Sequence, residues 1–338
     1  MIDIHENQLL KNLACPYTKN NLNLENDGKF IWFKSDNFKY PIRNGVPILF
    51  SNNNYDNLNE AFKNSIQDFW NSGWEKRGKE NDHYFLYNLT SEEFQNIIQK
   101  KYKFEESRGP GIGGLLSNEI KIDSLRNKTS LIIGPGCGLE AIELKFITKT
   151  KVIGLDVSFQ SAYLTNTLLQ NFDNNSDICV QGDARYLPIK SNLIDFVFSH
   201  GALHHSPDIQ KSVDEIYRVL RPNGKFCVAL YNKYSLEWSK FLLNALLKGN
   251  WTKKKLDKYI SSETEKAWTT SNKKNPYTKL FSKSECFELF RSFDNLNIRN
   301  GNFKTPNNLL LKFLKLLENT TIMSKFGSMI YITGEKKN

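Results

Sequence analysis

The chain lacks most of the features that mark membrane, secreted or disulfide-bonded proteins. No apolar run reaches the ~18 residues that a membrane-spanning helix needs, and no signal-peptide pattern opens the sequence. The five cysteines are odd in number and scattered, which is typical of reduced thiols. We therefore expect a cytoplasmic protein without a transmembrane segment. Its 338 residues leave room for one full α/β domain and one or two smaller units.

Clustered charge is also missing, although the formal net charge is +10. A surplus of this size is compatible with nucleic acid or an anionic membrane as a partner. The lysines are dispersed with acids between them, however, and no basic stripe is visible. Solvated surface charge is therefore the simpler explanation.

Residues 131–140, Leu-Ile-Ile-Gly-Pro-Gly-Cys-Gly-Leu-Glu, carry the strongest functional signal. An apolar run is followed by Gly134, Gly136 and Gly138 and then by an apolar-periodic stretch, which predicts a strand, a tight turn and a helix. Glycine permits close approach of a ligand and positive φ angles. A dinucleotide fingerprint would need a further glycine at position 139, where this chain has leucine.

Four more motifs follow in order, at 152–158, 181–184, 195–205 and 215–226. Together with the glycine turn they resemble class I S-adenosylmethionine (SAM) methyltransferases. The resemblance implies an α/β, Rossmann-like fold with a seven-stranded sheet and an antiparallel last strand, expected at 329–334. It also implies SAM as cofactor and S-adenosylhomocysteine as product.

The same resemblance implies a set of cofactor-binding residues. Asp156 would accept hydrogen bonds from the ribose hydroxyls, Asp183 would lie at the adenine amino group, and His200 would contact the methionine part through its backbone. The full expected set is Gly134, Gly136, Gly138, Asp156, Val157, Asp183, Ala184 and His200. One departure matters: many family members carry an acid where this chain has Ile132, so the amino group of the cofactor needs another partner.

A methyltransferase must align its acceptor with the methyl group and exclude water. His204 and His205 follow the expected fourth strand, and either is a candidate general base; alternatively, one of them packs as scaffold. An aromatic cap and the end of the fifth strand complete the expected acceptor site, with Trp70, Trp74, Tyr84, Tyr231 and Asn232. The alternative for the aromatic residues is ordinary core packing.

Residues 9–50 resemble the small β domain of the methyltransferase activator Trm112, through Cys15-Pro16-Tyr17-Thr18 and the Tyr-Pro-Ile stretch at 40–42. Thr18 stands where zinc-binding members have a second cysteine, and structural zinc needs four ligands, so we expect no metal. The residues expected on the apolar face are Leu22, Leu24, Phe30, Trp32, Ile42 and Ile48.

We expect three units along the chain. They are a Trm112-like β domain at 1–52, a helical cap or linker at 53–126, and the methyltransferase domain at 127–338 with a helical insertion at about 235–325. Cap helices are expected at 58–70, 91–103 and 115–125. An apolar segment with two basic residues at 309–317 could lie on a membrane, although such helices more often pack on their own domain.

Three functions remain open at this point. The first is methyl transfer to a small-molecule or glycan acceptor, with the β domain and cap forming the acceptor site. The second is methylation of ribosomal or transfer RNA, although the rRNA guanine methyltransferases carry an intact zinc site. The third is a non-catalytic SAM-fold subunit that binds a partner through the Trm112-like module; Asp156 and Asp183 argue against it because a non-binder has no need of buried acids. The acceptor atom and the oligomeric state stay undetermined.

Overall fold

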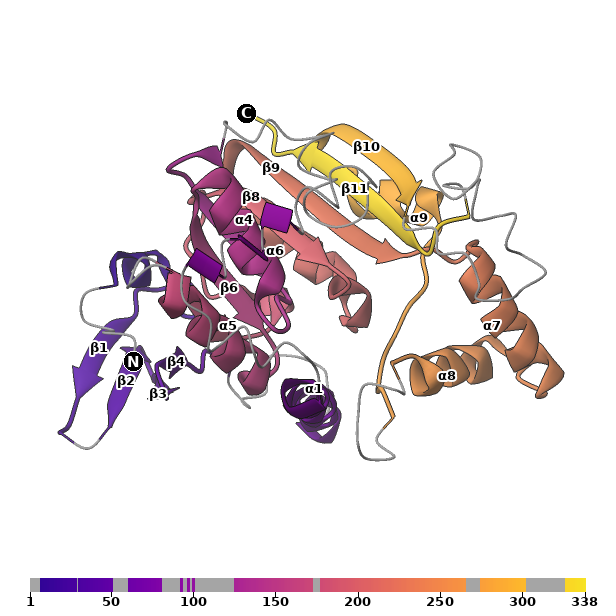
Figure 1. Ribbon diagram of the computed structural model, residues 1–338, viewed down its shortest axis with the longest axis horizontal. Coiled ribbons are helices and arrows are strands. Elements are labelled where there is room, and N and C mark those ends of the chain that lie inside the picture. Colours follow the sequence, from indigo (N-terminus) through magenta and orange to yellow (C-terminus); the bar gives the residue numbers. More distant parts are fainter. Residues whose placement is uncertain are drawn as a thin grey trace.

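The computed structural model describes residues 7–28, 30–50, 60–80, 92–93, 96–97, 99–100, 125–172, 177–265, 274–301 and 326–338. Two sheets organise these residues, one of four strands and one of seven (Figure 1). No helix in the described ranges is long and apolar enough to cross a membrane. Tyr84, the 309–317 segment and most of the helices expected at 91–103 and 115–125 lie outside the described residues.

The seven-stranded sheet has the order β10-β11-β9-β8-β5-β6-β7. Strands β5 to β9 run parallel, and β11 is inserted antiparallel between β9 and β10, which confirms the expected fold class. The strand bounds are β5 Thr129–Ile133, β6 Lys151–Asp156, β7 Ile178–Gln181, β8 Ile194–His200, β9 Leu220–Tyr231, β10 Asp294–Gly301 and β11 Met329–Glu335.

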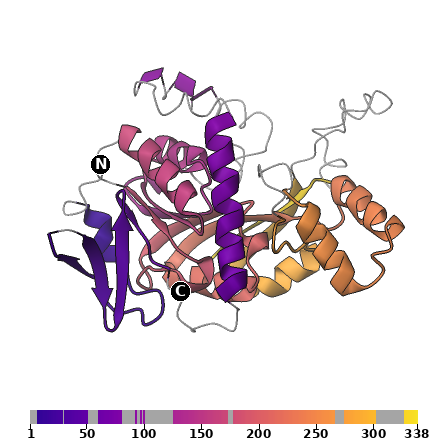
Figure 2. The same cartoon turned by 90° about the horizontal axis from the view of Figure 1, so that it is seen from below.

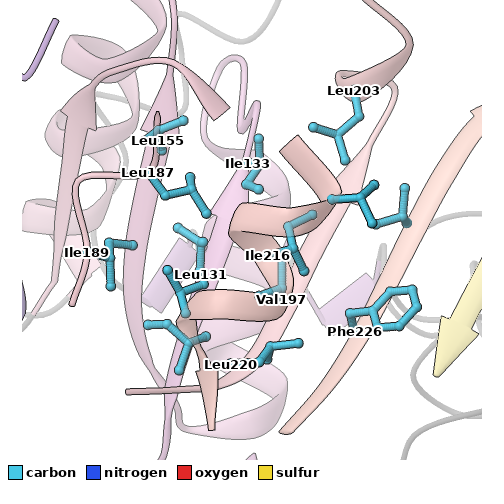
Figure 3. Close-up of a cluster of buried hydrophobic side chains, with 14 of the residues drawn as sticks. Leu131, Ile133, Leu155, Leu187, Ile189, Val197, Leu203, Ile216, Leu220 and Phe226 are labelled. Atoms are coloured by element: carbon cyan, nitrogen blue, oxygen red, sulfur yellow. The ribbon is translucent and has the colours of Figure 1, made fainter. Parts of the chain in front are cut away.

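Helices cover both faces of this sheet because alternate strand residues point to opposite sides. Leu131 and Ile133 pack with α6 and α9 on one face, in the cluster shown in Figure 3. Ile132 packs with α4 and α5 on the other face. The bounds of these helices are α4 Leu139–Thr148, α5 Phe159–Phe172, α6 Ile209–Val219 and α9 Lys283–Leu289.

Three further helices lie outside this layered core. Helix α1 spans Glu60–Glu80, ten residues beyond the end expected at Trp70, and packs on α5. Helices α7 (Leu236–Leu247) and α8 (Lys253–Glu263) form a hairpin at the end of the molecule opposite the four-stranded sheet (Figures 1 and 2). Ser235 and Thr252 cap these two helices through their side-chain oxygens.

The amino-terminal sheet consists of β1 Asn23–Asn26, β2 Ile31–Ser35, β3 Phe38–Arg43 and β4 Val46–Pro47, all antiparallel. Its inner face is one residue out of phase with the expected one. Phe33 is buried opposite Tyr40, whereas Phe30 is 52% exposed and Trp32 is partly exposed. The expectation was wrong at Phe30 and Trp32 because neighbouring strand residues point to opposite faces. Leu22, Leu24 and Ile42 do pack against the core, each partly buried.

This sheet is joined to the large one by backbone pairing. Ile48 forms a parallel bridge with Gln181 of edge strand β7, and Leu13 forms an antiparallel bridge with Ile189. The buried Cys15 thiol lies 3.2 Å from the Tyr40 hydroxyl, and Thr18 donates to Asp36 at 2.9 Å. No group of three or more His, Cys, Asp or Glu residues that could hold a metal occurs in the described part of the chain.

Candidate active site

A cavity of about 620 Å³ opens at the carboxyl ends of the parallel strands, next to α1. Loops after β5, β6, β7 and β8 contribute to its wall, as does Tyr231 at the end of β9. This is the position at which open α/β sheets bind ligands, and the volume suits a small molecule with a cofactor.

Gly134 and Gly136 line the cavity with φ angles of 74° and 61°. A Cβ on Gly134 would lie 2.2 Å from Ala202 Cβ, and one on Gly136 would lie 2.4 Å from the Trp74 ring. These two glycines therefore allow Ala202 and Trp74 to lie close to the backbone of the loop. Gly138 does not line the cavity. A Cβ there would lie 2.8 Å from the Thr165 backbone, so its glycine permits α4 to pack on α5.

Asp156 ends β6 and is buried in the cavity wall. Its carboxylate accepts hydrogen bonds from the Ser158 amide at 2.9 Å and the Ser161 hydroxyl at 2.5 Å. Burial raises the pKa of Asp156 to about 6, although these donors act in the opposite direction. Val157, the next residue, also lines the cavity.

Asp183 and Ala184 lie in the cavity wall after β7. The Asp183 carboxylate accepts from the Arg185 amide at 2.9 Å and from the Arg185 guanidinium, whose Nε lies 3.0 Å from Oδ1. Arg185 thus fixes the orientation of this carboxylate and offsets its charge. The expected contact with adenine must coexist with this ion pair.

His200 and Glu140 form a polar pair on the cavity wall beside the glycine loop. His200 Nδ1 lies 2.7 Å from Glu140 Oε1, and both residues line the cavity. Glu140 occupies the first turn of α4, directly after the glycine loop. It brings a carboxylate to the region where Ile132 leaves the family's usual acid missing.

The structure separates the two candidate histidines. The His205 ring lines the cavity, whereas His204 is completely buried outside it and stacks on Tyr231 with ring centroids 3.6 Å apart. Burial lowers the pKa of His204 well below its usual value. His204 is therefore not part of the cavity lining, unlike His205.

The His205 ring is contacted by Tyr277 and Thr278, in the segment before α9. Its Nδ1 lies 3.1 Å from the Tyr277 carbonyl oxygen and 3.0 Å from Thr278 Oγ1. The Asn275 amide nitrogen lies 3.2 Å from the same Nδ1, so this nitrogen has both an acceptor and a donor within reach. Nε2 is buried without a hydrogen-bond partner. Burial lowers the pKa of His205 to about 4, so the ring is neutral at pH 7.

Of the remaining acceptor-site candidates, three line the cavity and Asn232 does not. Trp70 and Trp74 of α1 line the cavity, and Trp70 contacts His205 with ring centroids 4.7 Å apart. Tyr231 donates to Glu265 at 2.5 Å at the same end of the cavity. Asn232 does not line it; its amide donates to the Gly327 carbonyl at 2.8 Å and serves the backbone.

Several lining residues were not anticipated from the sequence. They are Phe50, Ile66, Glu140, Arg185, Ser206, Pro207, Glu265 and Tyr331. Glu140 could have been found, because it is an acid in the turn that follows the glycine motif. Phe50, Glu265 and Tyr331 carry no local signal, since only the fold brings these distant segments to the cavity.

A known family model matches the part of the chain that forms much of this cavity. Residues 131–228 match the model described as a methyltransferase domain. This chain carries a methyltransferase domain. The match runs from within β5 to within β9 and so includes the glycine loop, Asp156, Asp183 and His205.

Relatives share this region at moderate identity. Sterol 24-C-methyltransferase of Schizosaccharomyces pombe is 30% identical over 99 residues, which are 29% of this chain and 26% of that protein. The ubiquinone/menaquinone biosynthesis C-methyltransferase UbiE of Rickettsia typhi is 27% identical over 153 residues, 43% of this chain and 61% of that protein. The methyltransferase domain is thus the shared part, and the chain spans less than two thirds of either relative.

Among solved structures, this chain is similar to phosphoethanolamine N-methyltransferase 2 of Haemonchus contortus in complex with phosphomonomethylethanolamine and S-adenosylhomocysteine. The identity is 15% and the TM-score 0.44, with 70% of this chain and 57% of that chain covered.

Proposed function

We propose that this protein transfers the methyl group of SAM to a small-molecule acceptor bound beneath α1. The observation that carries the proposal is the meeting, in one cavity, of the glycine loop, the buried Asp156 and the neutral His205. When bound, SAM supplies an electrophilic methyl group on a good leaving group. The work left to the protein is therefore binding, alignment, exclusion of water and, for some acceptors, removal of a proton.

The residues on the loop side fit SAM. Gly134 and Gly136 line the cavity with backbone that carries no side chain, which suits the methionine part of the cofactor. Asp156 is a carboxylate at the end of the second parallel strand, suited to accept from the ribose hydroxyls. Asp183, Ala184 and Val157 border the neighbouring space for adenine.

Glu140 compensates for the acid that is missing at Ile132. A cofactor with an α-ammonium group needs an anionic or carbonyl partner near the glycine loop. Glu140 lines the cavity there, and its Oε1 is oriented by His200 at 2.7 Å. In this proposal the Glu140 carboxylate binds the ammonium group and His200 keeps it in place.

The acidic lining of the cavity favours a neutral or cationic acceptor. Four acids line the cavity: Glu140, Asp156 and Asp183 border the space assigned to the cofactor, and Glu265 lies at the acceptor end with Tyr231. Arg185 is the only Lys or Arg in the described lining, and it contacts Asp183. A phosphate-rich acceptor such as RNA would meet this negative wall, so the structure supports RNA methylation less well.

Proton removal is assigned to His205. His205 belongs to the cavity lining, and its Nδ1 lies 3.1 Å from the Tyr277 carbonyl oxygen, which fixes the orientation of the ring. Tyr231 stays a phenol, since burial and the Glu265 carboxylate raise its pKa well above the usual value. Tyr231 therefore donates to Glu265 and fixes that carboxylate at the acceptor end of the cavity.

The amino-terminal sheet serves as a built-in Trm112-like module in this proposal, without zinc. Ile48, just after β4, already pairs through its backbone with Gln181 of edge strand β7, and Phe50 lines the cavity. Because this backbone pairing is already made within the chain, it argues against the module as a docking site for a separate partner. The cytoplasmic location suggested by the scattered cysteines stays a prediction.

Calorimetry with S-adenosylhomocysteine, followed by methyl-transfer assays on matched amines, alcohols and carboxylates, tests the proposal. We expect binding of S-adenosylhomocysteine and turnover with a neutral or cationic acceptor. Failure to bind S-adenosylhomocysteine would refute the cofactor assignment, and preference for an anionic acceptor would refute the account of the cavity.

The Glu140 assignment has a separate test that compares S-adenosylhomocysteine with 5′-methylthioadenosine, which lacks the amino-acid part. Glu140→Gln should weaken S-adenosylhomocysteine binding by about 1.5–3 kcal/mol and leave 5′-methylthioadenosine binding unchanged. Glu288→Gln, at an exposed position on α9, is the control. Equal effects of Glu140→Gln on both ligands would contradict the ammonium contact.

A further inference from the structure

The α7–α8 hairpin carries an exposed apolar surface that the methyl-transfer site does not use. Leu243, Leu247 and Trp251 are 59%, 76% and 75% exposed. Leu243 and Leu247 are one helical turn apart, so they share a face of α7, and Trp251 follows in the turn to α8. Exposed leucines and a tryptophan grouped in this way mark an interaction surface.

This face is distinct from the one that packs the hairpin on the protein. Trp238 and Ala245 of α7 are buried, and Trp238 joins Ile260 of α8 and Leu280 in a small core. The hairpin is therefore anchored by one side of α7 and presents Leu243 and Leu247 on another. Both views place it at the end of the molecule farthest from the amino-terminal sheet (Figures 1 and 2).

Positive charge surrounds the same surface. Residues 248–258 contain five lysines and one aspartate. Lys248 lies over the Tyr259 ring at 5.4 Å, and Lys253, Lys254 and Lys255 are exposed at the start of α8. A local concentration of positive charge therefore lies beside the exposed Leu247 and Trp251.

We propose that the α7–α8 hairpin docks this protein on the surface of an anionic lipid bilayer. Leu243, Leu247 and Trp251 enter the interface, and the lysines lie among the headgroups. Tryptophan prefers the boundary between headgroups and acyl chains, and each lysine near an anionic surface adds to the attraction. The combination suits a bilayer better than nucleic acid, which offers no apolar layer for the leucines. A second copy of this chain would bring lysine against lysine.

The docked hairpin would also bring the acceptor end of the cavity towards the membrane. Glu265, just beyond α8, lines that end, and Trp238 contacts Tyr231 with ring centroids 4.9 Å apart. Docking stands on the hairpin alone, however, and requires neither methyl transfer nor a particular acceptor.

Co-sedimentation of the full chain with vesicles tests docking. The wild type should bind vesicles of phosphatidylcholine with about 30% phosphatidylglycerol and not phosphatidylcholine alone, and raising the salt from about 0.1 M to about 0.5 M should weaken binding. Replacing Lys253, Lys254 and Lys255 by Gln should lower the partition coefficient by roughly tenfold or more. The same change at Lys11, Lys34 and Lys39, in the distant amino-terminal region, removes equal charge and should have a small effect.

A second set of measurements examines the apolar residues. Leu243→Asn with Leu247→Asn should abolish binding, while circular dichroism and S-adenosylhomocysteine affinity report an intact fold. The fluorescence of Trp251 should shift to the blue on anionic vesicles, a change absent from Trp251→Phe. Equal losses in the two lysine variants, or no vesicle binding by the wild type, would overturn the proposal. So would a dimer that Leu243→Asn and Leu247→Asn dissociate without any vesicle binding.

Discussion

Asp156 illustrates how burial at a single residue couples ligand affinity to pH. Its carboxyl group is buried at the end of β6, and its pKa is raised to about 6 by that burial. A ligand that donates hydrogen bonds favours the ionised form, which means that binding and deprotonation are linked. Protonation of Asp156 below pH 6 therefore removes a hydrogen-bond acceptor and weakens binding of such a ligand.

We predict that S-adenosylhomocysteine affinity is constant above about pH 7 and falls by up to about tenfold per pH unit below pH 6. Calorimetry from pH 5 to pH 8 in buffers of different ionisation heat measures both the affinity and the proton released. Asp156→Asn should bind about 1.5–3 kcal/mol more weakly at pH 7 and lose this pH dependence. A wild-type profile that stays flat across pH 6 would contradict the coupling.

The two adjacent histidines differ in position, because His205 lines the cavity and His204 does not. We predict that His205→Gln lowers turnover by about a hundredfold or more for an acceptor that must lose a proton, with S-adenosylhomocysteine affinity unchanged. His204→Phe keeps a ring against Tyr231 and should retain turnover within about threefold. Steady-state kinetics measures turnover of both variants, and calorimetry measures their affinity for S-adenosylhomocysteine. Equal losses of turnover at the two positions would contradict the assignment of His205 as the general base.

At the scale of the element, α1 divides its two tryptophans between the two halves of the cavity. Trp70 contacts His205, and Trp74 lies against Gly136, one helical turn further on. We predict that Trp74→Ala weakens S-adenosylhomocysteine binding by about 1–2 kcal/mol. Trp70→Ala should instead lower turnover with cofactor affinity nearly unchanged. Calorimetry paired with kinetics separates the two effects, and an interchange of the two phenotypes would contradict this division.

The sequence predicted the parallel strands β5 to β8 because each of them is a mostly buried apolar run that ends at a polar or glycine-rich loop. The loops that follow these strands bring the predicted Gly134, Gly136 and Asp156 together in the wall of one cavity. The amino-terminal sheet was harder: Phe30, Trp32 and Phe33 are all aromatic, so alternation alone could not decide which face is buried. Register with Tyr40 on β3 settles that question, and register is a property of the pair of strands.

Two residues of the cavity lining escaped prediction for a different physical reason. Glu265 and Tyr331 come from segments separated from the motifs by many residues, and their position depends on the packing of α8 and β11. His204 and His205 are equivalent in sequence pattern, and only the three-dimensional course of the chain distinguishes them. Local pattern therefore indicates the glycine loop and the residues at the strand ends, whereas tertiary packing decides which distant residues complete the cavity.

At the scale of the whole molecule, the small sheet and the large sheet share one hydrophobic cluster. Leu9, Leu13 and Phe33 belong to the same buried group as Leu155 and Val180 of the large sheet. The two are also linked by an ion pair of 2.7 Å between Lys19 and Glu215. A shared core of this kind makes the small sheet part of the folding unit that holds the cavity, even though the division at residues 1–52 stays a prediction.

Phe33 and Phe30 offer a matched pair with which to measure that coupling. Phe33 is buried in the shared cluster, and Phe30, just before β2, is exposed. We predict that Phe33→Ala lowers the free energy of unfolding of the whole chain by about 3–5 kcal/mol in a single transition, because it leaves a cavity in a common core. Phe30→Ala should change it by less than about 1 kcal/mol. Urea unfolding followed by circular dichroism and by loss of S-adenosylhomocysteine binding measures both. Two separate transitions, with ligand binding lost only in one that Phe33→Ala leaves unmoved, would mean that the amino-terminal sheet folds on its own.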